Sequence, residues 1–218
     1  MSLFQSDQIN TRLDEIDRLI RNRDIEFACQ KIDSVLADFS EVKIIYAHLV
    51  NLFLAIPDFQ RAKELFSIYK GVFNEEMVSD FSVDEIDFMQ NMAIEPDFAN
   101  DWMVFRWMTA SERGHFSQKF RFFPVKEIAI KNDQLRIKQR NKYSCYKFSD
   151  VASIAINLMN SRVFYGGFSS ASYLKREMKI TVDSGKTYAI DVSTSFPDLK
   201  GSITLERELK KKIGIIYN

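Results

Sequence analysis

Hydrophobic residues in the first half of the chain recur at the three- and four-residue steps of amphipathic helices. The first stripe consists of Ile9, Leu13, Ile16 and Ile20. A second helix, for which Asp24 is a suitable cap, would turn inward the residues Ala28, Ile32, Val35, Leu36 and Phe39. The same spacing predicts further helices over about residues 41–56, 58–71, 81–92 and 98–113. The first half is therefore expected to be α-helical.

A weak internal repeat runs through these helices. A shift of 34 residues places Asp24 on Asp58, Ala28 on Ala62 and Val35 on Tyr69. Helix pairs with this period resemble tetratricopeptide repeats, and the resemblance implies stacked helical hairpins that present a groove to a peptide or protein. Ile16 and Val50 depart from the family, which prefers small residues at these positions. The alternative is an α-helical bundle whose helices match in length.

In the second half the apolar positions alternate with a period of two, which indicates half-buried β-strands. Turns are predicted at Asn132-Asp133 and at Asn141-Lys142, and Asp183-Ser184-Gly185 is a strong hairpin signal. Six or seven short antiparallel strands are expected before a single helix from about Ser202 to Gly214, whose buried stripe would include Leu205 and Leu209. The chain as a whole is therefore expected to be an α+β protein.

The strand region contains Leu135-Arg136-Ile137-Lys138 and, further on, Tyr146-Lys147-Phe148-Ser149-Asp150-Val151-Ala152-Ser153-Ile154. This order of strand, Phe-Ser-Asp-Val turn and strand resembles bacterial pleckstrin-homology-like domains. The resemblance covers about residues 122–215 and implies a small antiparallel barrel that the C-terminal helix closes. Another small α+β or split-barrel domain is the alternative.

Charge supports a division into two domains. Residues 1–114 hold 11 Lys and Arg against 21 Asp and Glu, a net charge of −10, whereas residues 115–218 hold 19 against 9, a net of +10. We therefore predict a helical domain over 1–114, a linker over 115–123 and a sheet domain over 124–218. The longest apolar run is too short to span a bilayer. Because the chain start lacks a secretory signal pattern and the two cysteines lie far apart, we expect a cytoplasmic protein.

Basic residues in the second half form the main candidate surface. Arg136, Lys138 and Arg140 are spaced by two, so a strand would project all three from one face. Lys131 and Lys142 lie nearby and would extend a cationic surface. Such a surface suits anionic lipid headgroups or the protein's own acidic half. A solvated outer sheet face is the alternative reading.

No catalytic motif, phosphate-binding loop or metal-ligand cluster is recognised in the sequence, so no enzyme activity, cofactor or metal is expected. Nucleic acid is disfavoured as a partner because the acidic half would repel a polyanion. We expect a non-enzymatic adaptor whose helical domain binds a protein or peptide, with the sheet domain as a second docking module. Candidate groove residues are Tyr46, His48, Asn51 and Tyr69. The alternative function is a peripheral membrane module, and self-association through an exposed sheet edge stays open.

Overall fold

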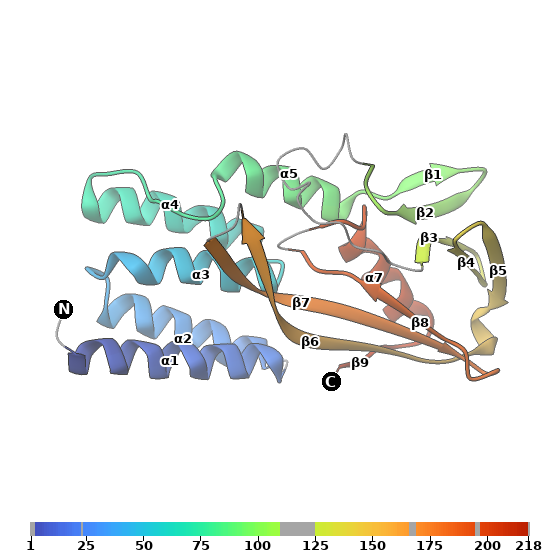
Figure 1. Ribbon diagram of the computed structural model, residues 1–218, viewed down its shortest axis with the longest axis horizontal. Helices are drawn as coiled ribbons and strands as arrows, with labels where there is room; N and C mark the ends of the chain where they lie inside the picture. The colour runs from blue at the N-terminus through green and yellow to red at the C-terminus, as the bar shows by residue number, and fades with distance from the viewer. Residues whose placement is uncertain (1–2, 23, 110–124, 166–168, 195–196, 218) are drawn as a thin grey trace. The chain divides into compact units, whose positions relative to one another are not determined.

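The computed structural model describes residues 3–22, 24–109, 125–165, 169–194 and 197–217, and it confirms the α+β class (Figure 1). The chain divides into two compact units, residues 1–86 and residues 87–218. Each unit has its own arrangement of secondary structure.

The first unit is built from helices that pack in consecutive pairs, α1 with α2 and α3 with α4. Their bounds are α1 Leu3–Arg21, α2 Ile25–Asp38, α3 Lys43–Ala55 and α4 Phe59–Phe73. A fifth helix, α5 (Val83–Ile94), runs across the division between the units. The structure thus confirms the helices predicted in the first 94 residues.

Most residues of the predicted apolar stripes lie on the buried faces of these helices. Ile9, Ile16, Ile20, Ala28, Ile32, Val35, Ala62, Leu65 and Tyr69 are buried, whereas Leu13, Leu36 and Phe39 are only half-buried. Helix α3 carries apolar residues on most of its circumference and buries more of them than its neighbours, as expected for a helix with packing partners on several sides. Asp58 caps α4, because its Oδ1 accepts a hydrogen bond from the Arg61 backbone N–H at 3.1 Å.

The second unit contains two sheets. The first, in the order β1-β2-β3-β4-β5, is antiparallel throughout and consists of β1 Asp97–Ala99, β2 Trp102–Arg106, β3 Val125–Lys131, β4 Gln134–Gln139 and β5 Lys142–Lys147. The second, in the order β8-β7-β6-β9, consists of β6 Val151–Tyr165, β7 Ser169–Val182, β8 Thr187–Asp191 and β9 Ile216–Tyr217. A short 3-10 helix, Phe148–Asp150, joins the sheets, and α7 (Ser202–Lys212) precedes β9. Strand β9 pairs with β6 in parallel, whereas β6, β7 and β8 are antiparallel.

The helix predicted over residues 98–113 is wrong over its described part. Residues 97–106 form the β1–β2 hairpin, and Asn100 and Asp101 turn the chain with φ angles of 51° and 65°. Because β2 also pairs with β3, this hairpin belongs to the second unit, and the division falls at Ile86 rather than near residue 114. The predicted linker, residues 115–123, lies outside the described residues.

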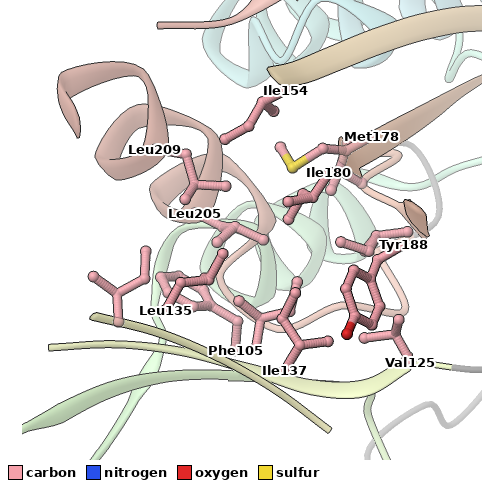
Figure 2. Close-up of a cluster of buried hydrophobic side chains, with 14 of the residues drawn as sticks. Phe105, Val125, Leu135, Ile137, Ile154, Met178, Ile180, Tyr188, Leu205 and Leu209 are labelled. Carbon is pink, nitrogen blue, oxygen red and sulfur yellow. The ribbon is translucent and has the colours of Figure 1, made fainter. Parts of the chain in front are cut away.

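One hydrophobic core fills the second unit between the two sheets and α7 (Figure 2). Phe105, Leu135 and Ile137 come from the first sheet, and Met178 and Ile180 come from the second. From α7 the core receives the predicted pair Leu205 and Leu209. The described strands form two separate sheets around this core and no closed barrel.

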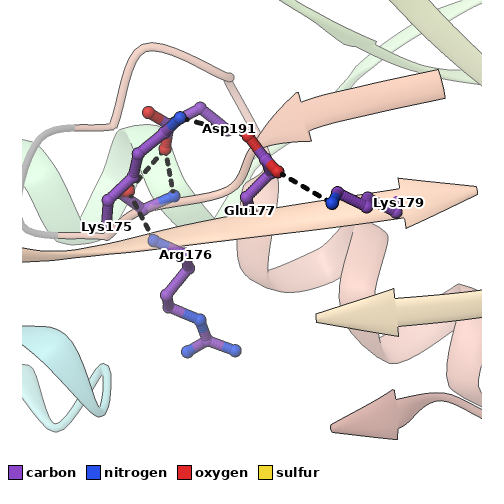
Figure 3. Close-up of polar contacts among 6 residues, drawn as sticks. Lys175, Arg176, Glu177, Lys179 and Asp191 are labelled. Carbon is purple, nitrogen blue, oxygen red and sulfur yellow. Dashed lines mark hydrogen bonds and ion pairs between the residues drawn. The ribbon is translucent and has the colours of Figure 1, made fainter. Parts of the chain in front are cut away.

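A buried ion pair lies at the edge of this core. Arg176 of β7 is 3% exposed and follows the same face of the strand as Met178 and Ile180, opposite to Lys175, Glu177 and Lys179 (Figure 3). Its guanidinium Nη2 contacts Glu206 Oε2 of α7, and Tyr217 Oη of β9 donates to the other oxygen of Glu206 at 3.2 Å. Arg176, Glu206 and Tyr217 therefore link β7, α7 and β9.

The start of α7 is held by the end of α5. Gly201, the residue that precedes α7, has a φ of 78° and donates its backbone N–H to the carbonyl oxygen of Met92 at 2.7 Å. Thr204 Oγ1 donates to the carbonyl oxygen of Ile94. An added Cβ at Gly201 would lie 2.9 Å from Phe105 Cδ1 and 3.0 Å from the backbone N and Cα atoms of Pro96. A residue without a side chain is needed at this position.

Candidate functional site

The outer face of the five-stranded sheet carries part of the predicted cationic surface. Lys138 pairs across the strands with Glu127 and Arg136 pairs with Ala129, so both cations project from this face. Arg136 Nη2 lies 3.2 Å from Glu127 Oε1, and its guanidinium lies 4.5 Å from the centre of the Trp102 ring. Lys138 Nζ lies 4.8 Å from the centre of the Tyr143 ring, and this contact raises the pKa of Lys138. These side chains are therefore engaged within the sheet.

Carboxylates accompany other cations of the same sheet. Lys131 Nζ lies 3.4 Å from Asp101 Oδ2, and Arg106 Nε lies 3.1 Å from Asp97 Oδ2. Exposed pairs of this kind add little stability, but they neutralise the local charge. The outer face is therefore a mixed surface of acids, bases and aromatic rings.

Arg140 does not share the face of Arg136 and Lys138, so this part of the prediction is wrong. Strand β4 ends at Gln139, and Arg140 occupies the first position of the two-residue turn into β5 with a φ of 50°. The alternation of faces stops where the strand ends. Arg140 lies instead beside a pocket of about 670 Å³.

This pocket, which we call the turn pocket, lies where the β4–β5 turn meets the turn before β8. Its lining residues are Gln139, Arg140, Asn141, Lys142, Tyr143, Ser144 and Lys186. Three of them are cations and, among the described residues that line it, none is a carboxylate. The structure thus brings two of the predicted basic residues, Arg140 and Lys142, together with Lys186, which sequence reasoning missed.

Two tyrosine hydroxyls lie next to the turn pocket. Tyr146 Oη and Tyr188 Oη are 2.6 Å apart, and Lys186 Nζ lies 4.7 Å from the centre of the Tyr188 ring. Burial acts to raise the pKa of Tyr188, but hydrogen bonds from Lys186, Ser144 and Tyr146 together lower it below its ordinary value. Burial and the hydrogen bond to Tyr188 raise the pKa of Tyr146. This environment stabilises negative charge on an oxygen atom.

In the helical unit, two of the four predicted groove residues lie in the core. Tyr46 and Tyr69 are buried and pack edge to face with ring centres 5.4 Å apart, and Phe73 completes the cluster. Tyr46 Oη donates to the carbonyl oxygen of Ser40 at 2.9 Å. Tyr69 Oη donates to Glu75 Oε1 at 2.7 Å, and this hydrogen bond raises the pKa of Tyr69 to about 12. Neither ring offers contact area for a ligand.

The other two, His48 and Asn51, are half-buried residues of α3. Asn51 Nδ2 lies 3.4 Å from Asp80 Oδ2. His48 lies near Asp14 and Asp17 of α1, and its Nε2 is buried without a hydrogen-bond partner among the described residues. Burial lowers the pKa of His48 although the two carboxylates act to raise it.

The lowered pKa of His48 predicts a loss of stability in mild acid. Below pH 6.5, the ordinary value, His48 gains a proton in the unfolded chain before it gains one in the folded chain. The free energy of unfolding should therefore fall between pH 7 and pH 5, by at most about 1.4 kcal/mol per pH unit for one proton. Burial raises the pKa of Asp17 above its ordinary value of 3.8, so protonation of Asp17 has the opposite effect and adds stability as the pH falls toward 3.8. Urea unfolding at pH 7, 6 and 5 measures this slope.

The matched variant is His48→Gln, which removes the titrating group and keeps a polar side chain of similar size. Its unfolding free energy should depend less on pH over this range than that of the wild type. If the unfolding free energies of the two proteins depended equally on pH, His48 would not be the group responsible. His115, the second histidine of the chain, is present in both proteins and cancels in the comparison.

A small groove lies on the helical unit between α2 and α4, with Phe53 of α3 in its lining. We call it the helix groove; its volume is about 260 Å³ and its lining residues are Asp33, Leu36, Phe53, Arg61, Glu64, Leu65 and Ile68. The apolar residues offer a hydrophobic surface. Arg61 Nη1 lies 3.9 Å from Asp33 Oδ1, and Arg61 Nε lies 3.6 Å from Asp58 Oδ2. The rim of the groove is therefore acidic, and its cation, Arg61, already has carboxylate neighbours.

Within the described ranges, no cluster of three or more His, Cys, Asp or Glu side chains has the arrangement of a metal site. No helix in the described part of the chain is both long and apolar enough to cross a membrane. Comparisons with protein families, with curated proteins and with solved structures find no match to this chain.

Proposed function

We propose that the protein is a non-enzymatic adaptor whose helical unit binds a peptide segment of a partner protein in the helix groove. The observation that carries this proposal is the groove itself, where an apolar lining from three helices lies beside exposed carboxylates. Such a site suits a segment that inserts an apolar side chain and places a Lys or Arg against Asp33 or Glu64.

The finer fold assignments are part of the proposal. Helices pair as α1–α2 and α3–α4, and residues related by the 34-residue shift share full burial, as with Ile16 and Val50 or Ala28 and Ala62. This agreement supports a tetratricopeptide-like unit. In the second unit, the 3-10 turn at Phe148–Asp150 and the packing of α7 on the core support a pleckstrin-homology-like domain with open sheets.

Selection of peptides from a random display library with the purified full chain tests the groove. We expect enriched sequences that combine an apolar residue with Lys or Arg, and we expect Ile68→Glu to weaken their binding at least tenfold. Ile68 is 46% exposed, so a charge there should leave the fold intact while it removes the apolar contact. The matched control is Val78→Glu, which places the same charge at a 90% exposed apolar residue of the same unit outside the groove lining.

The proposal would be contradicted if Val78→Glu weakened peptide binding as much as Ile68→Glu does. A failure to enrich any peptide sequence would also contradict it. The membrane alternative has less support, because Arg136 and Lys131 on the sheet face have carboxylate partners. Co-flotation with anionic vesicles that Arg136→Ala/Lys138→Ala abolishes would favour that alternative.

A further inference from the structure

We infer that the turn pocket binds a ligand through a phosphate monoester group. This site lies in the second unit and does not depend on the helix groove, so it goes beyond the proposed adaptor function. Three cations from two turns of the chain, Arg140, Lys142 and Lys186, converge on it. The described lining residues include no carboxylate, the backbone at Arg140 has a positive φ, and neutral donors lie beside the cations.

The three cations differ from those of the outer sheet face in their surroundings. Arg136, Lys131 and Arg106 each have a carboxylate within 3.4 Å. Within the described part of the chain, the structure shows no ion pair for Arg140, Lys142 or Lys186. Like charges that face one pocket repel, and a bound anion relieves this repulsion. The pocket is therefore electrostatically matched to a negative ligand.

The backbone at Arg140 provides a second observation. Its φ of 50° lies in the left-handed region, where Gly or Asn is the less strained choice for a two-residue turn. Arginine therefore carries a conformational cost at this position, and strained residues of this kind cluster at ligand-binding sites. A guanidinium offers paired donors that match two oxygens of a phosphate, which lysine cannot do.

Neutral donors and an aromatic surface complete the site. Ser144 lines the pocket and interacts with the tyrosine pair, and Tyr143 presents a ring that is 51% exposed. A volume of about 670 Å³ lies in the range of sites for small organic ligands, roughly 300–1,000 Å³. A phosphate monoester carries about −1.5 to −2 charges at neutral pH, which three cations can neutralise. The organic part of the ligand would then lie against the Tyr143 ring.

Phosphate monoesters occur on soluble metabolites and on lipid headgroups, and the two sources require separate probes. The soluble probes are ribose 5-phosphate and glycerol 3-phosphate, with ribose and glycerol as phosphate-free controls. The membrane probe is a phosphatidylcholine vesicle that contains phosphatidic acid, with pure phosphatidylcholine as its control. Calorimetry with the full chain measures binding of the soluble probes and their controls. Co-flotation measures binding to the two kinds of vesicle.

The test variant is Arg140→Gln/Lys142→Gln/Lys186→Gln. The control, Lys126→Gln/Lys147→Gln/Lys212→Gln, removes the same charge at exposed residues of the same unit outside the turn pocket. We expect the test variant to lose at least tenfold in affinity and the control to lose less than about threefold, because loss of a charge-assisted hydrogen bond costs more than loss of distant charge. Binding of the soluble probes assigns the site to a metabolite, and binding of the vesicles alone assigns it to a lipid headgroup.

A single substitution keeps the proposal testable if the triple variant does not fold. Arg140→Gly should relieve the backbone strain and raise the melting temperature by about 2–4 °C, as expected for a small stability gain in a chain of this size, while it weakens phosphate binding. Failure of every phosphorylated probe to bind the wild type overturns the inference. Equal loss of binding in the test and control variants also overturns it, because the binding would then reflect net charge only.

Discussion

Replacement of Arg176 by leucine is expected to lower the free energy of unfolding by about 3–5 kcal/mol. The substitution removes the cation that faces Glu206 of α7 and leaves a largely buried carboxylate with Tyr217 as its neighbour. Burying an unpaired charge costs far more than the pair itself contributes, because the solvation lost on folding is no longer offset. Urea unfolding monitored by circular dichroism measures the loss.

Two further variants separate the buried charge from a general effect of the substitution. Arg176→Leu/Glu206→Leu removes both charges and should recover most of the lost stability. Lys179→Gln breaks an ion pair with Glu177 on the opposite face of the same strand, where Lys179 is exposed, and should change stability by less than about 0.5 kcal/mol. A double variant as unstable as Arg176→Leu would show that the packing of Arg176, and not the isolated carboxylate, sets the loss.

Gly201→Ala is expected to lower the free energy of unfolding by about 2–5 kcal/mol. About 1–2 kcal/mol of this loss comes from a left-handed backbone at a residue with a Cβ, and about 1–3 kcal/mol comes from overpacking. The new methyl group would meet the Phe105 ring at 2.9 Å and the Pro96 backbone at 3.0 Å, and the backbone has little room to move because its N–H donates to Met92. Thermal and urea unfolding both report this change.

Gly185→Ala is the matched control for this prediction. Gly185 has a φ of 80°, close to that of Gly201, but an added Cβ there meets nothing within 4 Å. Its loss should therefore be confined to the conformational cost, about 1–2 kcal/mol. If the two alanine variants lose the same stability, the contacts around Gly201 are not restrictive.

The helices of the first unit could be predicted because their apolar stripes are long and regular and because Asp58 is a cap that acts locally. The prediction over residues 98–113 failed because it followed apolar spacing and ignored the turn chemistry. Asn100-Asp101 carries two consecutive positive φ angles, and an Asn or Asp pair between apolar runs is a hairpin signal. The misplaced domain boundary followed from that one error, since β2 joins the sheet through β3.

The candidate sites were predicted only in part, because a site depends on which turns and faces come together. The sequence placed Arg140 and Lys142 close to one another, since Arg140 lies in the β4–β5 turn and Lys142 directly follows it. Lys186 lies 44 positions beyond Lys142, and no local pattern indicates that its turn meets theirs. Likewise, the polar hydroxyls of Tyr46 and Tyr69 suggested a surface, whereas hydrogen bonds to Ser40 and Glu75 allow both rings to be buried.

The strand order of the second unit has a consequence for how it folds. In both sheets, hydrogen-bonded neighbours are consecutive in the chain, except where β9 pairs with β6. A bridge from Trp107 to Leu199 joins the end of β2 to the segment before α7. Hairpins such as β3–β4 and β4–β5 close short loops at low entropic cost, whereas these two pairings join distant segments and are expected to form later. Folding is therefore expected to begin in the hairpins and to end when α7 docks, so that the last step brings Leu199 and β9 into register together.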